Sequence, residues 1–297
     1  MRVDPFYLNN LSGALNQTQE NQEQLSQEIS SGLRFSEIGQ DPVAAAENVQ
    51  MLNQIDRDDS FTQTASLTQG MLQVTDSALG SVVTQLNQAL SLATEGNNGT
   101  LSASDLKSIS NQIAGIRDEV LSLANTNYQG VYVFGGSQSG AAPFTLDNST
   151  SPATVTYNGD ENVNTLVTPN GQAIQLNIPG DQVFSQAGTD VLGTLNNLVA
   201  DFANGNSGVQ DTTALTDSLN YLSQQRVAID NSITRLNAAS SVGTEEKTQL
   251  TKAQTDLMQA DIAQVSTQLS LTESQQTALM DMLASLGQGS LFDRLQA

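Results

Sequence analysis

The chain has 297 residues, with 31 Asp and Glu against 10 Lys and Arg, and it contains no Cys, His or Trp. Without Cys and His it lacks disulfides, the usual zinc ligands and the commonest general base, so we expect no enzyme, no metal and no cofactor. The net charge of -21 makes nucleic acid and anionic membranes poor partners, and no apolar run approaches the ~20 residues of a membrane helix.

The first predicted element is an amphipathic helix that ends near Gly32. Its apolar residues recur in alternating steps of three and four, which is the spacing of a coiled-coil seam rather than of a globular surface helix. Polar residues interrupt this seam in its middle. The seam consists of Leu8, Leu11, Leu15, Thr18, Gln22, Leu25 and Ile29.

A short irregular spacer, 34–40, separates this helix from a longer one. Asp41 is a good N-cap and Pro42 suits the first helical position. The sequence therefore predicts a helix over 43–94, with Gly96 as its C-terminal stop.

A third helix is expected after the turn at 97–100, capped by Ser102 or Ser104 and running to about Tyr128. At Gly130 the period changes to that of β-structure. Asn158-Gly159 and Asn170-Gly171 are hairpin-turn signals, because both residue types tolerate positive backbone angles. Short strands are predicted at 131–134, 154–157, 165–168 and 173–178.

Helices return near Asp190, over 191–202, and again from about Thr212. The last predicted element is a long helix over 258–286 that carries a second seam in steps of four and three, again with Thr and Gln in its middle. Its seam residues are Met258, Ile262, Val265, Leu269, Thr272, Gln276, Leu279, Leu283 and Leu286.

The two seams match each other. An antiparallel alignment places Thr18 opposite Gln276 and Gln22 opposite Thr272, where an amide can hydrogen-bond a hydroxyl, and every other layer is apolar. A parallel alignment that places Thr18 beside Thr272 matches almost as well. The spacing predicts that the ends of the chain pair, and it leaves their direction open.

Several motifs resemble those of the bacterial flagellin superfamily, and most closely the hook-associated protein 3 family of hook–filament junction proteins. The N-terminal likeness rests on Ser31, Gly32 and Arg34, followed by Asp41, Pro42 and Val43. Further similar stretches are Tyr132-Val133-Phe134-Gly135-Gly136, Gln259-Ala260-Asp261-Ile262 and Ser290-Leu291-Phe292-Asp293-Arg294-Leu295.

This resemblance implies a mainly α-helical structural subunit of the bacterial flagellum with an inserted β-domain. The expected domains are a terminal coiled coil of 1–40 and 254–297, a helical bundle of 41–129 and 188–253, and a β-rich insert of 130–187. The resemblance also implies an antiparallel terminal pair. Expected partners are further copies of the chain, another hook-associated protein, flagellin and an export chaperone, with extracellular localisation reached without a cleaved signal peptide.

Two other functions fit the sequence less well. One is a filament-forming flagellin, and the other is an acidic secreted binding module or effector that displays the β-domain. Independently of the family, an isolated pair of ~50 helical residues with two polar layers is marginal, because ordering each residue costs roughly 1–2 kcal/mol. We therefore expect the terminal helices to be largely disordered in the free monomer and to fold on assembly.

Overall fold

The computed structural model describes residues 5–37, 39–186 and 188–295. Contacts divide the chain into two compact units. One consists of Met1–Asp56 with Glu246–Ala297, and the other of Arg57–Glu245. The predicted class, mainly helical with inserted strands, is confirmed.

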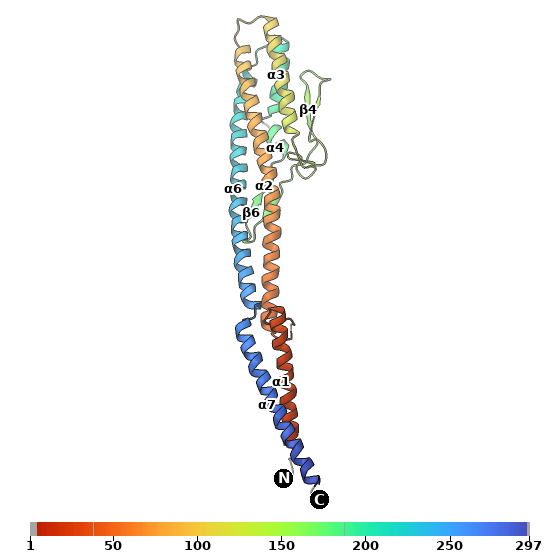
Figure 1. Cartoon of the computed structure of the whole chain (residues 1–297). Coiled ribbons are helices and arrows are strands. Elements are labelled where there is room, and N and C mark those ends of the chain that lie inside the picture. Colours follow the sequence, from red (N-terminus) through yellow and green to blue (C-terminus); the bar gives the residue numbers. More distant parts are fainter. Residues whose placement is uncertain (1–4, 38, 187, 296–297) are drawn as a thin grey trace. The chain divides into compact units, whose positions relative to one another are not determined.

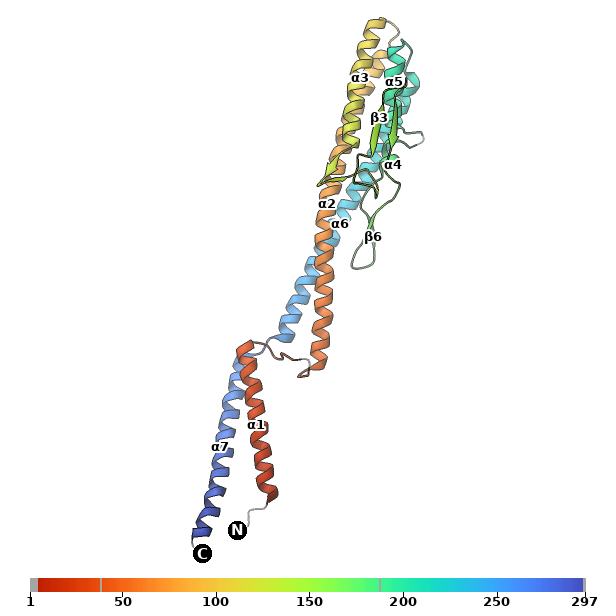
Figure 2. The same ribbon diagram turned by 90° about the vertical axis from the view of Figure 1, so that its right-hand side faces the viewer.

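The first unit contains the two terminal helices, α1 (Pro5–Ser31) and α7 (Ile262–Leu295), which pack against each other. The start of α1 and the end of α7 lie at the same end of this pair, so the helices are antiparallel (Figures 1 and 2). The unit also holds the beginning of α2 (Pro42–Gly96) and the end of α6 (Val209–Met258). The predicted pairing of the chain ends is confirmed, and the direction that spacing left open is antiparallel.

The helix starts follow the cap signals of the sequence. The Asp41 carboxylate accepts a hydrogen bond from the Ala44 amide at 3.0 Å, and α2 begins at Pro42 as predicted. Ser102 caps α3 (Ala103–Ala124) in a reciprocal capping box with Asp105. Asp190 caps α5 (Val191–Ala203) through the Gly193 amide. Each cap satisfies amides that would otherwise lack a partner in the first helical turn.

The last long helix differs from the prediction. The seam spacing suggested one helix over 258–286, but α6 ends at Met258 and α7 begins at Ile262. The interruption forms because Leu33 and Gln259 pair in an antiparallel β-bridge, which takes the backbone out of the helix. Asp261 then starts α7 by accepting hydrogen bonds from the amides two and three residues later.

The second unit packs α2, α3, α5 and α6 and the strand segment around one apolar core. Leu79, Val82 and Leu86 of α2 are fully buried in it. Three phenylalanines join the strand segment to the same core: Phe134 and Phe144 each meet Phe184 edge-on, with ring centroids 5.1 and 5.4 Å away. Phe184 belongs to the short helix α4 (Gly180–Phe184), which the sequence did not predict.

The described strands form three separate antiparallel pairs rather than one sheet. The pairs are β1 (Asn127–Tyr128) with β2 (Val131–Tyr132), β3 (Phe144–Asp147) with β4 (Thr154–Tyr157), and β5 (Thr165–Val167) with β6 (Ala173–Gln175).

Strand β4 and the hairpin of β5 and β6 lie where the sequence predicted them. Gly171 has a φ of 83° in the tight turn between β5 and β6, which explains the glycine there. The signal at Asn158-Gly159 was wrong, because this pair follows β4 without forming a hairpin. The backbone amide of Asn158 donates to Pro143 O at 2.7 Å, next to the pairing of β4 with the unpredicted strand β3. The third helix ends at Ala124 instead of Tyr128, because Tyr128 pairs with Val131 in the first hairpin.

The predicted boundaries of three domains remain a prediction, since the strand segment lies in the same compact unit as α3 and α5. Within the described residues, no helix combines the length and the hydropathy that crossing a membrane requires.

Candidate functional site

Helix α1 buries one narrow stripe along its length. Leu11 and Thr18 are 8 and 9 % exposed, while their neighbours in sequence on both sides are exposed. The half-buried residues of α1 include Leu15, Gln22, Leu25 and Ile29, which complete the predicted seam with the same alternating steps. Burial thus follows the coiled-coil spacing on which the prediction was based.

Helix α7 shows the matching stripe. Val265 is 6 % exposed, and Ile262, the second residue of the predicted seam, is 43 % exposed, so the covered stripe on α7 starts at Val265. Leu8 and Leu286 lie outside the residues whose side chains are described. The half-buried members of the stripe are Leu269, Thr272, Gln276, Leu279 and Leu283.

The hydroxyls of the two seam threonines donate within their own helices. Thr18 Oγ1 donates to Ala14 O at 2.8 Å, and Thr272 Oγ1 donates to Gln268 O at 2.9 Å. Each oxygen keeps free acceptor capacity, so a bond across the seam requires a glutamine amide as the donor. The arrangement is compatible with Gln276 donating to Thr18 and with Gln22 donating to Thr272.

The outer faces of the terminal helices carry few charges. The sequence of α1 contains three glutamates and no Lys or Arg. On α7, Leu271, Met280 and Met282 are 60, 49 and 50 % exposed. Hydroxyls on the same helix donate to the carbonyl four residues earlier, as Thr267 does to Ala263 O at 2.8 Å. A neighbour could cover such a surface without burying many ion pairs.

The residues of the N-terminal motif lie where α1 ends and α2 begins. Gly32 adopts a φ of 70° and donates its amide to Glu28 O, which ends α1 in the left-handed conformation that glycine favours. The Arg34 guanidinium forms an ion pair with Asp41 at 2.8 Å and lies 5.7 Å from the centre of the Phe35 ring. Asp41 therefore caps α2 with one carboxylate oxygen and binds Arg34 with the other.

The remaining motif residues have simpler roles. Ser31 Oγ accepts a hydrogen bond from the Leu33 amide at 3.2 Å. Pro42 is the first residue of α2, and Val43 is 77 % exposed, so Val43 offers an uncovered side chain beside the capped helix start.

The same segment is bonded to the opposite end of the chain. Arg34 donates its amide to Met258 O at 2.7 Å, and Ala260 donates its amide to Gly32 O at 3.0 Å. Phe35 is 5 % exposed and packs in a small cluster with Ala44, Ala45, Leu257 and Met258. Sequence reasoning did not identify Phe35 or Ala260 as part of this junction, although each lies within or beside a motif that it had singled out.

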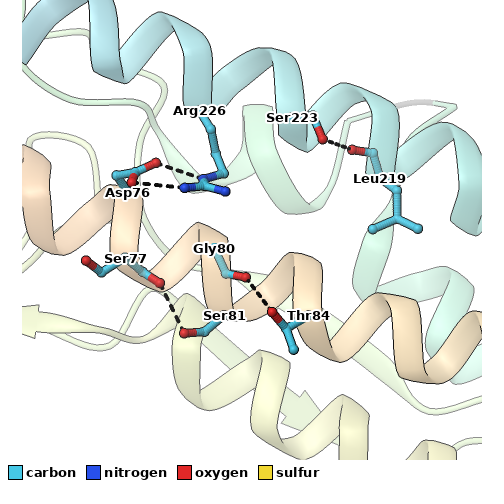
Figure 3. Close-up of polar contacts among 8 residues, drawn as sticks. All are labelled: Asp76, Ser77, Gly80, Ser81, Thr84, Leu219, Ser223 and Arg226. Atoms are coloured by element: carbon cyan, nitrogen blue, oxygen red, sulfur yellow. Dashed lines mark hydrogen bonds and ion pairs between the residues drawn. The ribbon is translucent and has the colours of Figure 1, made fainter.

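The long helices α2 and α6 are joined in the second unit by a bidentate ion pair (Figure 3). Arg226 of α6 donates Nε and Nη2 to the two carboxylate oxygens of Asp76 at 2.8 and 3.1 Å. This bonding raises the pKa of Arg226. A Cβ atom at Gly80 would lie 3.4 Å from the guanidinium carbon, at ordinary van der Waals distance, so the guanidinium packs directly over this part of α2. Sequence reasoning missed this pair because the two residues are 150 positions apart.

The groups described above make packing, capping and ion-pair contacts. Within the described ranges, no three Asp or Glu side chains converge closely enough to hold a metal ion. The features that stand out are the stripe shared by α1 and α7, their weakly charged outer faces, and the bonded junction around Arg34. These are features of an assembly surface.

Comparison with known proteins agrees with this reading. Residues 7–139 match the family described as the bacterial flagellin N-terminal helical region. Flagellar hook-associated protein 3 of Salmonella typhimurium is 29 % identical over 181 residues, which cover 61 % of this chain and 55 % of that protein. The chain thus spans about half the length of that relative. The protein of the same name from Escherichia coli is 25 % identical over 280 residues, covering 86 % of this chain and 87 % of the relative.

A solved structure shows the same fold. A protein from Vibrio parahaemolyticus, described as a flagellar hook-associated protein, aligns with a TM-score of 0.65 and 18 % sequence identity. The alignment covers 74 % of this chain and 100 % of that chain. At this identity the similarity concerns the fold alone.

Proposed function

We propose that the chain belongs to the bacterial flagellin superfamily, is of the hook-associated protein 3 type, and is a structural subunit of the flagellum that joins the hook to the filament. The single observation that carries the proposal is the antiparallel pair of α1 and α7, which leaves apolar residues such as Leu271 exposed on faces with few charges. An exposed apolar surface of this kind marks an interaction site.

In this proposal the seam residues hold the terminal pair together, and the outer faces contact neighbouring subunits. Leu15 faces Leu279, and Thr18 faces Gln276, in the antiparallel register. The motif around Arg34 and Asp41 fixes the point at which the terminal pair meets α2. The three predicted domains would form an inner layer of terminal helices, a second layer of bundled helices, and an outer β-rich layer.

The partners are further copies of the chain in a ring or tube, another hook-associated protein on the hook side, and flagellin on the filament side. We place the assembled protein outside the cell, exported without a cleaved signal peptide and accompanied before export by a chaperone that binds its C-terminal segment. An amphipathic helix that lacks its partner offers an apolar face to such a groove. The role is structural and involves no catalysis.

The terminal pair is expected to become ordered when neighbours cover its outer faces. The seam contains two polar layers, and the exposed methionines of α7 gain burial only in an assembly. Hydrogen exchange on dilute monomer should show rapid exchange in α1 and α7 and slow exchange in the core around Leu79. Strong protection of both terminal helices in the monomer would contradict this expectation.

The function is tested by deleting the coding region in the source bacterium and imaging the flagella. A missing junction subunit leaves intact hooks on the cells and loose filaments in the medium. Cells without filaments, and medium without filaments, would instead identify the chain as the filament subunit. Normal filaments attached to hooks would refute a structural role at the junction.

The register is tested by disulfide crosslinking, because the native chain contains no Cys. The pair Leu15→Cys with Leu279→Cys should form an intrachain disulfide in assembled protein. The matched control, Leu15→Cys with Leu269→Cys, places the second thiol about three helical turns away and should not react. Crosslinking of the control alone would refute the proposed register.

A further inference from the structure

One turn of the chain combines the groups needed for a spontaneous covalent modification. Asn-Gly pairs occur at 98–99, 158–159, 170–171 and 204–205. In such a pair the backbone nitrogen of the glycine can attack the side-chain carbonyl carbon of the asparagine and close a five-membered ring. The reaction depends on whether that nitrogen is available and on whether the backbone can bend to bring it into position, which glycine allows best.

Asn98 and Gly99 lie in the exposed turn between α2 and α3. The backbone of Asn98 is held on both sides, because its amide donates to Glu95 O at 3.0 Å and its carbonyl accepts from the Leu101 amide at 3.2 Å. Among the residues that the structure describes, none accepts a hydrogen bond from the Gly99 amide. The nucleophilic nitrogen is therefore not engaged.

The side chain of Asn98 is also activated. Thr100 Oγ1 donates a hydrogen bond to Asn98 Oδ1 at 3.1 Å. When the ring closes, negative charge develops on this oxygen, so a donor already in place stabilises the tetrahedral intermediate. The side chains of Asn98 and Thr100 are exposed, which leaves the departing amide nitrogen open to water.

The comparison with two other Asn-Gly pairs separates these factors. Asn170 also accepts a hydrogen bond from a threonine hydroxyl, that of Thr168, but the amide of Gly171 donates to Thr168 O at 2.8 Å. The Gly205 amide donates to Phe202 O at 3.2 Å. Attack at either site must first break a hydrogen bond, which slows the reaction.

At the remaining pair the leaving group is held instead. Asn158 Nδ2 donates to Thr145 Oγ1 at 3.2 Å, and the Tyr157 ring packs against Gly159. Of the pairs in this chain, only 98–99 combines an unengaged nucleophile, an activated carbonyl and an exposed leaving group in the described structure.

We propose that Asn98 is the site of spontaneous deamidation in this protein, with Thr100 as the positioning residue. The Gly99 nitrogen bonds to Asn98 Cγ, the Cγ–Nδ2 bond breaks, and the proton from the Gly99 amide leaves with Nδ2 as ammonia. Water then opens the cyclic imide at either of its two carbonyls, giving aspartate or isoaspartate at position 98. The modification needs no enzyme and no reagent besides water, and it adds one negative charge to the turn.

The test is to incubate the purified full chain in mildly alkaline buffer and to follow each Asn-Gly peptide by mass spectrometry. The peptide that contains Asn98 should gain the mass that distinguishes a carboxylic acid from an amide, and it should become a substrate for an isoaspartyl methyltransferase. Its rate should exceed those of the other three peptides by about fivefold, since a hydrogen bond of about 1 kcal/mol corresponds to roughly this factor. A faster reaction at any other pair, or equal rates at all, would overturn the proposal.

Two variants separate the factors without disturbing the fold. A Cβ atom at Gly99 would meet nothing within 4 Å, so Gly99→Ala fits the turn and should slow deamidation at Asn98 by at least about fivefold. Thr100→Val removes the hydroxyl at nearly constant shape and should slow deamidation at Asn98 several-fold. Thr100→Ser keeps a hydroxyl and should retain the native rate. If Thr100→Val reacts as fast as the native chain, Thr100 has no positioning role. Circular dichroism and the rate at Asn170 serve as the controls for folding.

Discussion

Replacing Thr18 and Gln276 together by leucine tests whether the two residues share one layer of the terminal pair. Each single substitution places a leucine opposite a polar side chain. In Thr18→Leu the Gln276 amide loses the acceptor proposed for it, at a cost of about 1–3 kcal/mol, whereas in Gln276→Leu the Thr18 hydroxyl keeps its bond to Ala14 O and the cost is smaller. The double substitution removes both polar groups and creates an apolar layer like those of Leu11 and Leu25.

The magnitude follows from burial at the two positions. Thr18 is 9 % exposed, so a leucine there would be almost fully covered, and full burial of a leucine contributes about 1.5–3 kcal/mol. Gln276 is half-buried and gains less. Against this stand about 1 kcal/mol for the hydrogen bond from Thr18 to Ala14 and some strain from added volume. The double variant should stabilise the pair by about 1–3 kcal/mol, while each single variant should be near neutral or destabilised.

The assay is amide hydrogen exchange in α1 and α7 of assembled protein, compared among the native chain, both single variants and the double variant. The coupling free energy between the two positions should be about 1 kcal/mol or more, as for residues in contact. The matched control combines Thr18→Leu with Thr272→Leu, which lie in different layers, so that their effects should add. Additivity in the first pair together with coupling in the control would refute the register.

Three further results are expected. Asp41→Ala should destabilise the start of α2 by about 0.5–2 kcal/mol, measured from hydrogen exchange of the first amides of α2. The control Asp41→Asn keeps the cap and loses only the exposed ion pair with Arg34, so it should destabilise α2 much less. Gly136→Ala should lower the free energy of unfolding by at least about 1–2 kcal/mol, because φ is 69° there and the new Cβ would collide with Asp160; an unchanged midpoint would show that the turn adapts. Hydrogen bonds from Ser137, first from its side chain and second from its backbone amide, lower the pKa of Asp160 to about 2 in the folded state. The pKa of the same carboxyl in the unfolded chain is about 3.9. This carboxylate therefore stabilises the fold above about pH 4, and the stabilisation is lost as the pH falls through about 2, so the destabilisation by Ser137→Ala should shrink over that range in acid unfolding curves.

Local signals in the sequence predicted what local physics decides. The cap at Asp41 and the stripe from Leu11 to Ile29 depend on residues a few positions apart, and both are present in the structure. The tight turn at Gly171 is of the same kind. The functional class followed from the family likeness of these segments, since periodicity alone gave only an amphipathic pair.

The features that sequence reasoning missed depend on distant partners. The spacing of apolar residues could not predict the break after Met258. Met258 and Ile262 keep the four-residue step of the seam, although the backbone between them leaves the helix. Asp261 followed three residues later by Gln264 was a signal that could have marked the new helix start. Strand β3 alternates apolar and polar residues over only four positions, Phe144–Asp147, which is too short a stretch to predict a strand, and its existence depends on pairing with β4.

The hydroxyls of α7 that bond to their own helix have a mechanical consequence. A face of methyl groups and internally bonded hydroxyls, such as those of Thr267, Ser274 and Thr277, has no directional bond to keep with whatever lies against it. In the proposed assembly, subunits packed through such faces would be able to slide by a fraction of a helical turn while each of these hydroxyls keeps its bond within α7.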